Sequence, residues 1–309
     1  MLFSRFREVY FFSLLLGITI SFGSKLWAAA CCGGGIAAAG LIPGDEGALL
    51  STSFTHSQVV VESVDSAGIW RTSDVRQEVE TFRIEAARIF QDRWQAGLSV
   101  PMIQRSRAGV KSSGVGDLAT NLGYEYLPDW DYNPWRPRGL GYLQVILPTG
   151  RSRAESELGG LDSRGNGFWS LGLGTLLTKA WGLWDGAISL ELHQSFAKRV
   201  HTATFDGDVL PGRGGSFSIG AGHSFHGLRL GANLVWSYED PINMKPAYAV
   251  EEPGSAERYA TASVSASLDL GEEWSANLTV ADQTLFGSPV NTSLGRSVAL
   301  SLQRRWGRE

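Results

Sequence analysis

Residues 173–192 read LGTLLTKAWGLWDGAISLEL, and this stretch decides the fold. Trp181 and Trp184 bracket a glycine, and apolar residues then return at every second position through Leu192. Such alternation places one set of side chains on each face of a β-strand. Amphipathic indole rings favour the boundary between hydrocarbon and water. The segment therefore predicts a strand that begins at a membrane boundary and presents one face to lipid.

The same alternation recurs along the chain. In residues 228–238 the even positions hold Leu, Ala, Trp and Tyr, and the odd positions hold mostly Arg, Gly, Asn and Ser. Across the strands, the polar face is small and uncharged as often as charged, which fits a narrow lumen better than the open surface of a soluble β-sandwich. About twelve strands are predicted: 48–61, 76–90, 94–102, 115–127, 138–148, 167–179, 183–196, 214–225, 228–238, 258–270, 273–285 and 295–306.

The connections between these strands alternate in length. Short turns are predicted near 91–93, 179–182, 226–227 and 271–273. Long polar segments are predicted at 62–74, 103–113, 150–165, 198–212, 239–257 and 286–294. Outer-membrane barrels alternate short periplasmic turns with longer external loops, and use an even number of strands. We therefore predict an all-β fold, a transmembrane antiparallel up-and-down β-barrel of about 12 strands.

Tryptophans mark one end of the predicted barrel. Trp94, Trp184 and Trp274 each follow a short turn, and Trp306 lies at the end of the last strand. In a barrel these positions share one depth, at the periplasmic edge of the hydrocarbon, so they predict an aromatic girdle. The alternative is that they are ordinary core tryptophans of a soluble protein.

The N-terminal residues are predicted to be a secretory signal peptide. Arg5 and Arg7 precede a short apolar run, and small residues lead up to Cys31. The run is too short to span a bilayer comfortably, so a retained anchor is the less favoured alternative. The predicted divisions are a cleaved signal peptide at 1–30, a Gly-rich lead or plug at 31–46, and the barrel at 47–306. We expect export to the outer membrane of a Gram-negative bacterium.

Two adjacent cysteines follow the predicted cleavage site. Cys31 and Cys32 cannot form a C-x-x-C metal site. Three interpretations stay open: lipid modification of Cys31, a vicinal disulfide in an oxidising compartment, or pairing with another protein. The first two are favoured over free thiols, because exposed thiols oxidise there.

The predicted register places several charged side chains in the lumen. The lumen-facing candidates are Arg83, Glu85, Glu125, Glu191, Arg229, Asp269 and Arg305. Their signs are mixed, so they do not form the single-sign ladder of a charge-selective channel. Because an unpaired charge in a confined lumen is costly, ion pairing that fills the barrel is favoured over contact with a solute.

Composition and motifs exclude several functional classes. The formal net charge of −4 argues against a nucleic-acid partner. The sequence contains no H-E-x-x-H, G-x-S-x-G or P-loop motif, so we predict no enzymatic activity, no catalytic residues, no cofactor and no metal. An outer-membrane enzyme built on His193 and Ser195 is a distant alternative, because both are predicted to face the lumen and lack an orienting partner.

Part of the chain resembles a known family. The segments RIFQDRWQAGLSVPMI (88–103), SSGVGDLATNLGYEYL (112–127), LGYLQVILPTGR (140–151) and NGFWSLGLGTLL (166–177) resemble the outer-membrane transporter-like barrels named for the MetA pathway of phenol degradation. The shared features are Pro101, the G-x-G-D at Gly114–Asp117 and the P-T-G at Pro148–Gly150. The resemblance covers roughly residues 76–200. It implies an outer-membrane barrel that carries small hydrophobic or aromatic molecules.

Together these observations predict a channel or transporter for small solutes, including hydrophobic ones, surrounded by outer-membrane lipid. The alternative is a closed barrel with a structural or surface-interaction role and no transport. The solute and the oligomeric state are not indicated by any motif.

Overall fold

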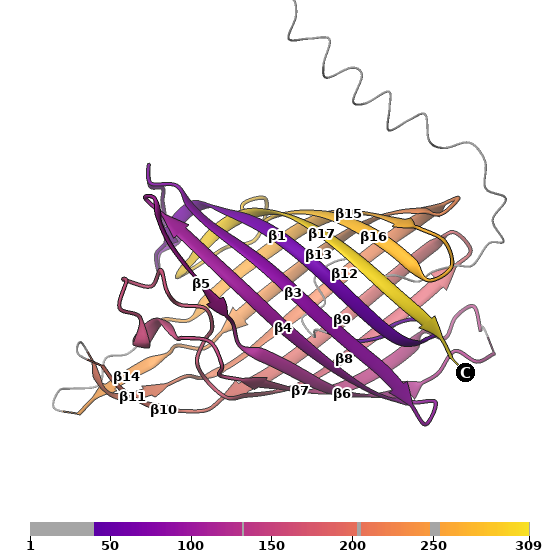
Figure 1. Cartoon of the computed structure of the whole chain (residues 1–309), viewed down its shortest axis with the longest axis horizontal. Coiled ribbons are helices and arrows are strands. Elements are labelled where there is room, and N and C mark those ends of the chain that lie inside the picture. Colours follow the sequence, from indigo (N-terminus) through magenta and orange to yellow (C-terminus); the bar gives the residue numbers. More distant parts are fainter. Residues whose placement is uncertain (1–39, 132, 203–204, 248–253, 309) are drawn as a thin grey trace, which may run out of the picture.

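The structure is a computed structural model of the whole chain, and it describes residues 40–131, 133–202, 205–247 and 254–308. Twelve antiparallel strands form a closed barrel, which confirms the predicted fold (Figure 1). The barrel strands are β1 (Glu46–Val64), β3 (Gln77–Phe90), β4 (Trp94–Arg107), β6 (Leu118–Leu127), β7 (Arg138–Leu147), β8 (Ser170–Trp181), β9 (Trp184–Ser195), β12 (Arg213–Phe225), β13 (Leu228–Glu239), β15 (Glu257–Asp269), β16 (Trp274–Asp282) and β17 (Thr292–Gly307).

The barrel closes between its first and last strands. β1 pairs with β17 antiparallel, with Ser51 opposite Gln303 and Phe54 opposite Leu300. Every other barrel strand pairs with its neighbours in the chain. Closure satisfies the backbone hydrogen bonds within the wall, which is the requirement that lipid imposes on a spanning sheet. Among the described residues, no helix is long and apolar enough to cross a membrane.

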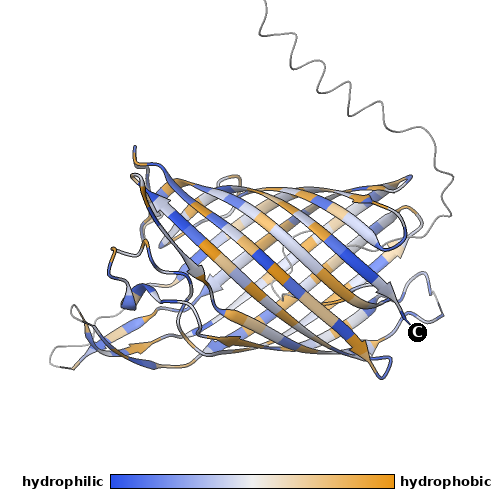
Figure 2. Cartoon of the chain, viewed as in Figure 1, coloured by the Kyte–Doolittle hydropathy of each residue, from blue (hydrophilic) through white to orange (hydrophobic). Residues whose placement is uncertain are grey.

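The wall is apolar outside and polar inside. Large apolar side chains alternate along each strand and face outward, as in Leu173 and Leu192, which are 67% and 61% exposed. Figure 2 shows hydrophobic and hydrophilic residues alternating along the strands of the barrel. Between them, small polar residues face inward. An apolar outer surface of this extent is stable in hydrocarbon and costly in water.

The two ends of the barrel differ. One end, here called the short-turn end, carries the turns around 91–93, 182–183, 226–227 and 270–273 together with the C-terminus (Figure 1). It also carries the longer connection between β6 and β7, of which residues 128–131 and 133–137 are described. There the indole Nε1 of Trp181 donates a hydrogen bond to the carbonyl of Pro134 at 2.9 Å.

At the opposite end, here called the long-loop end, the structure differs from part of the sequence prediction. Four of the segments predicted as loops contain short strands: β2 (Trp70–Arg71), β5 (Val110–Val115), β10 (Lys198–His201), β11 (Asp206–Leu210) and β14 (Asn243–Pro246). β4 and β5 make a hairpin across the predicted loop 103–113, and β10, β11 and β14 form a separate sheet. Beyond the hydrocarbon both faces of a strand meet water, so the alternation of apolar residues fades while backbone pairing continues.

A small second core supports the long-loop end. Phe168, Val200 and Val209 are buried together, and Ala154 and Phe205 pack against them. Ala154 belongs to the short 3₁₀ helix η1 (Arg153–Glu155) of the connection 148–169. This apolar contact joins that connection to β10 and β11, so the long-loop end holds a folded assembly of loops.

Candidate functional site

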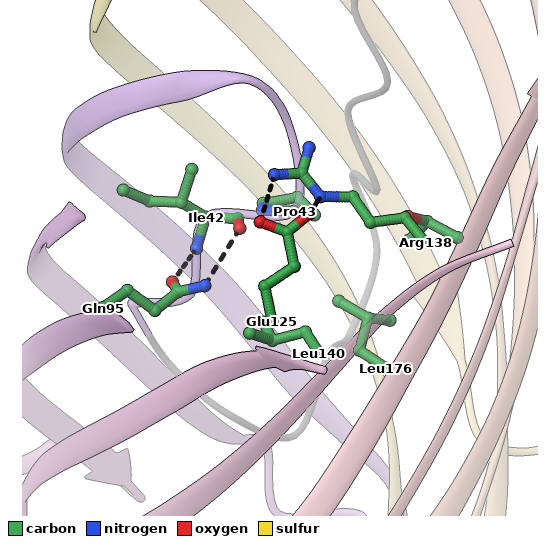
Figure 3. Close-up of a pocket in the computed structure, with 8 residues that line it drawn as sticks. Ile42, Pro43, Gln95, Glu125, Arg138, Leu140 and Leu176 are labelled. Atoms are coloured by element: carbon green, nitrogen blue, oxygen red, sulfur yellow. Dashed lines mark hydrogen bonds and ion pairs between the residues drawn. The ribbon is translucent and has the colours of Figure 1, made fainter. Parts of the chain in front are cut away.

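The lumen holds part of the chain's own N-terminal segment. Residues 40–45 enter the barrel and are seated by inward-facing side chains of β4 and β6 (Figure 3). Gln95 accepts a hydrogen bond from the backbone N–H of Ile42 at 2.7 Å and donates one to its carbonyl at 3.2 Å. The side-chain amide of Asn121 donates to the carbonyl of Gly40 at 3.3 Å. The segment therefore has its backbone polar groups satisfied inside the lumen.

Apolar contacts add to this seat. Leu41 is buried in a cluster with Leu140, Tyr142 and Leu176 from β7 and β8. These three side chains face inward, where the rest of the wall is mostly small and polar. These inward-facing apolar side chains of β7 and β8 therefore remove Leu41 of the N-terminal segment from water.

Glycine at position 97 permits the close approach of this segment. A Cβ at Gly97 would lie 2.0 Å from the carbonyl oxygen of Gly40, a distance that no side chain can occupy. At Gly172, another inward-facing glycine, an added Cβ would have its nearest neighbour at 3.5 Å, which is ordinary contact. Gly97 is therefore required by the N-terminal segment, whereas Gly172 is not required by any close contact.

Ion pairs cross the short-turn end of the lumen. The guanidinium of Arg138 contacts Glu125 at 2.6 Å and Asp45 at 2.8 Å, which links the wall to the N-terminal segment. Arg305 contacts Asp269 at 2.8 Å and Glu46 at 3.6 Å. Arg138, Glu125 and Arg305 are largely buried, so their charges are stabilised by their partners more than by bulk water, whereas Asp45 is exposed.

Two further pairs line the lumen, one near the short-turn end and one midway along β3. Arg229 makes a two-pronged contact with Asp185, with Nε donating to the carboxylate at 2.7 Å. Arg83 lies 3.8 Å from Glu85 on the same strand and is half exposed. All seven charged residues predicted to face the lumen lie on the inward-facing positions of their strands. The structure pairs them with one another or with residues that the sequence analysis did not single out.

A chain of hydrogen-bonding groups runs from β7 to β13. The phenol of Tyr142 donates to Glu191 at 3.2 Å, and His193 lies 3.6 Å from Glu191 and 3.1 Å from Glu239. Ser195, on the same face of β9 as His193, bonds instead to the hydroxyl of Ser170. The imidazole is thus engaged by two carboxylates, and the serine by another hydroxyl, so they do not form a nucleophile–base pair.

The remaining inner wall is lined by small hydroxyl residues. The hydroxyls of Ser189 and Ser218 are 2.6 Å apart, and Asn277 donates to Ser267 at 2.6 Å. The buried inward-facing serines of the barrel strands are Ser51, Ser99, Ser170, Ser189, Ser218, Ser265, Ser267 and Ser275. We call this surface the serine wall. Its hydroxyls can exchange hydrogen bonds with water or a solute without a full charge.

The tryptophans predicted as a girdle lie at the short-turn end. Trp94, Trp184 and Trp274 face outward and are 38%, 59% and 40% exposed. Trp306 is half-buried, and the guanidinium of Arg304 lies over its ring at 4.9 Å. These positions suit rings at a lipid boundary. Cys31 and Cys32, with the predicted signal peptide, lie outside the described residues.

The motifs that carried the family resemblance meet at the long-loop end. The carboxylate of Asp117 accepts hydrogen bonds from the backbone N–H groups of Gly150, Asn166 and Gly167 at 2.9, 2.7 and 3.2 Å. The hydroxyl of Thr149 donates to the carbonyl of Gly116 at 2.7 Å. A Cβ at position 165 would lie 2.3 Å from the Asp117 carboxyl. These contacts fasten the connection 148–169 to the start of β6.

A second carboxylate organises the same connection from within. Burial alone raises the pKa of Asp162, but hydrogen bonds from Ser156, Arg151 and the N–H groups of Glu157 and Leu158 outweigh it. The pKa of Asp162 therefore lies well below its usual value. The connection is held by a group that stays ionised at neutral pH.

Sequence reasoning missed several of these residues. Gln95 and Asp185 occupy inward positions of correctly predicted strands, so the alternation itself could have identified them. Asp117 was noticed only as part of a motif, and its contacts to residues 150–167 depend on tertiary structure. Among the described residues, no group of three or more His, Cys, Asp or Glu could hold a metal ion.

Comparison with known proteins supports the fold. No protein-family model matches the sequence, and a search of curated proteins finds no match. The COG4313 outer membrane channel from Pseudomonas putida F1 is similar in structure, with a TM-score of 0.67 and 15% identity over 86% of this chain and 100% of that chain. An identity this low supports a shared outer-membrane barrel fold and nothing finer.

Two other solved structures are less similar. The KdgM porin has a TM-score of 0.40 and 10% identity over 82% of this chain and 98% of its own. A mutant of the TodX monoaromatic hydrocarbon channel has a TM-score of 0.44 and 10% identity over 86% of this chain and 91% of its own. Neither adds to the argument. The resemblance to the family named for the MetA pathway therefore stays a prediction.

Proposed function

We propose that this protein is a channel for small solutes in the bacterial outer membrane, with its N-terminal segment acting as a displaceable plug. The observation that carries the proposal is the seating of residues 40–42 against the inner wall. The plug occupies the side formed by β4, β6, β7 and β8, and the serine wall lines much of the rest. A polar, weakly charged wall suits the passage of water and small solutes.

The number of contacts argues for a reversible plug. Four side-chain hydrogen bonds hold residues 40–45: two from Gln95, one from Asn121 and one from Arg138 to Asp45. Each contributes on the order of 1 kcal/mol net, and burial of Leu41 and Ile42 adds about 2 kcal/mol each. Ordering the backbone of residues 40–45 opposes this by about 1 kcal/mol per residue, so a few kcal/mol remain. A few kcal/mol is the range in which a segment exchanges between a docked majority and a released minority.

Hydrophobic solutes, as the sequence resemblance implies, are the cargo we expect.

A substitution at Gly97 tests the proposal directly. Gly97→Ala would place a methyl group on the carbonyl of Gly40 and should expel the segment without changing the charge of the lumen. Gly172→Ala adds the same methyl group to another inward position that has room for it. We expect small or infrequent single-channel conductance steps from the refolded wild-type protein, larger steps from Gly97→Ala, and wild-type behaviour from Gly172→Ala.

The alternative is a closed barrel with a structural or surface-interaction role. It is favoured by the burial of Leu41 and by the ion pairs that tie Arg138 to Asp45 and Glu125. The same recordings separate the two. If wild-type and Gly97→Ala proteins are both silent, while heat-dependent gel mobility shows that both are folded, the channel proposal fails and the closed barrel stands.

A further inference from the structure

The inner face of the long-loop end carries a guanidinium that the wall does not pair. Arg105 lies on β4, opposite Val79 of β3 and Ser112 of β5. Its position has the same parity as Gln95 and Ser99, whose side chains face the lumen, so Arg105 also faces inward. Its neighbours in register are uncharged. Arg83 and Arg229 have a carboxylate on a nearby inward-facing position of the wall, whereas Arg105 has none in the strands that the structure describes.

A second arginine reaches the same face from the connection 148–169. The guanidinium carbon of Arg164 lies 2.7 Å from the Cβ position of Gly114, and its Nη1 donates to the carbonyl of Ser113 at 2.8 Å. Gly114 pairs with Ile103, an inward position of β4 two residues from Arg105. The Arg164 guanidinium therefore lies over Gly114, at the strand position opposite Ile103, and Arg105 is two residues, or about 7 Å, further along β4 on the same surface.

A third arginine adds to the local positive charge. Arg153, in η1, is close enough to Arg105 for its charge to act on it electrostatically. The three acidic residues of this connection are engaged elsewhere. Glu155 contacts Lys198 at 2.7 Å, and Asp162 and Glu157 contact Arg151 at 2.6 and 3.9 Å.

Two donors of this cluster are buried and unused. Among the described residues, the Nε atoms of Arg105 and Arg164 have no hydrogen-bond partner, although both are shielded from solvent. In the part of the chain that the structure describes, no carboxylate lies within ion-pair distance of Arg105, Arg153 or Arg164. Buried guanidinium donors are normally satisfied, and leaving them so costs free energy. An oxyanion would satisfy several of them at once, because its geometry matches the guanidinium fork.

We propose that Arg105 and Arg164 form a binding site for the carboxylate or phosphate group of a small solute, on the inner face of the long-loop end. The inward direction of Arg105 favours a solute that enters the lumen over a lipid headgroup outside the wall. The site goes beyond the proposed channel function, since binding there does not require the barrel to conduct.

The test measures binding to the refolded full-length protein in a neutral detergent. The probe is 4-fluorobenzoate, followed by ¹⁹F NMR line broadening, and 4-fluorobenzyl alcohol is its uncharged analogue. We expect saturable broadening with the carboxylate and none with the alcohol. Arg105→Gln and Arg164→Gln should each weaken binding about tenfold or more, the effect of losing one charge-assisted hydrogen bond. Arg199→Gln, on β10 beside Asp206 and Asp208, should leave binding unchanged.

Competition identifies the source of the anion. Excess inorganic phosphate should displace the fluorobenzoate, and purified lipid A micelles should not. Displacement by lipid A would overturn the assignment to a lumenal solute. The proposal also fails if wild-type protein gives no saturable broadening, or if folded Arg105→Gln binds the probe as tightly as wild type. Because the readout is binding, a silent barrel in conductance recordings would leave this result intact.

Discussion

The carboxamide of Gln95 pairs with both backbone polar groups of Ile42, a residue 53 positions earlier in the chain. It accepts from the N–H and donates to the carbonyl, so one side chain makes the two hydrogen bonds that a neighbouring β-strand would make. The N-terminal segment is thereby fixed in the lumen without joining the sheet. Figure 3 shows the pair beside the contact between Glu125 and Arg138.

Removing this pair should loosen the plug. Gln95→Ala deletes both hydrogen bonds and leaves the backbone of Ile42 buried without them, at a cost of about 2 kcal/mol. We expect the docked fraction of the segment to fall roughly thirtyfold relative to the released fraction. Single-channel recordings should show longer or more frequent open periods than wild type. Gln303→Ala is the control, because Gln303 lies on β17, away from the strands that seat the segment. Identical recordings from Gln95→Ala and wild type would contradict this account of the plug.

Asp117 should control the stability of the long-loop end and leave the barrel intact. Asp117→Ala removes the acceptor for three backbone N–H groups, and each hydrogen bond to a charged group contributes about 1.5–3 kcal/mol. We expect the connection 148–169 to be cut faster by trypsin, which cleaves after arginine. The connection contains Arg151, Arg153 and Arg164. The heat-dependent gel shift of the barrel should change little. Asp131→Ala, at the short-turn end, is the matched control. Unchanged cleavage of Asp117→Ala would show that the carboxylate does not hold this connection.

Acid should open the same connection through Asp162. Its pKa is lower in the folded state than in the unfolded state, so its stabilising effect is complete above the ordinary aspartate pKa of about 4. The effect is lost progressively as the pH falls below that value toward the folded-state pKa. We expect pepsin to cleave the connection 148–169 increasingly as the pH is lowered from about 4 to about 2.

The control for this pH dependence is Asp162→Asn. The amide keeps the size of the carboxyl group but has lost the charge at every pH, so cleavage should be fast throughout the range. If Asp162→Asn and wild type show the same pH profile, another group controls the opening. Cleavage sites mapped by mass spectrometry would show whether the barrel strands themselves stay protected.

The sequence was informative wherever a strand passes through hydrocarbon. Lipid on one side and a confined lumen on the other force an alternation that can be read residue by residue, as in Ile188, Ser189 and Leu190. The parity that places Glu191 and Arg229 inward follows from the same rule. Prediction failed at 103–113, where β4 and β5 continue as a hairpin outside the membrane, because water on both faces leaves no alternation to detect.

The amino-acid sequence by itself determined the closed antiparallel barrel, the approximate limits of its strands and the face that each side chain takes. These depend on local periodicity and on the solvent that each face meets. Only the tertiary structure decided which charges pair, that Gln95 and Gly97 receive the N-terminal segment, and that Arg105 and Arg164 meet on one surface. Such contacts join residues tens of positions apart, and their geometry depends on the closure and register of the whole sheet.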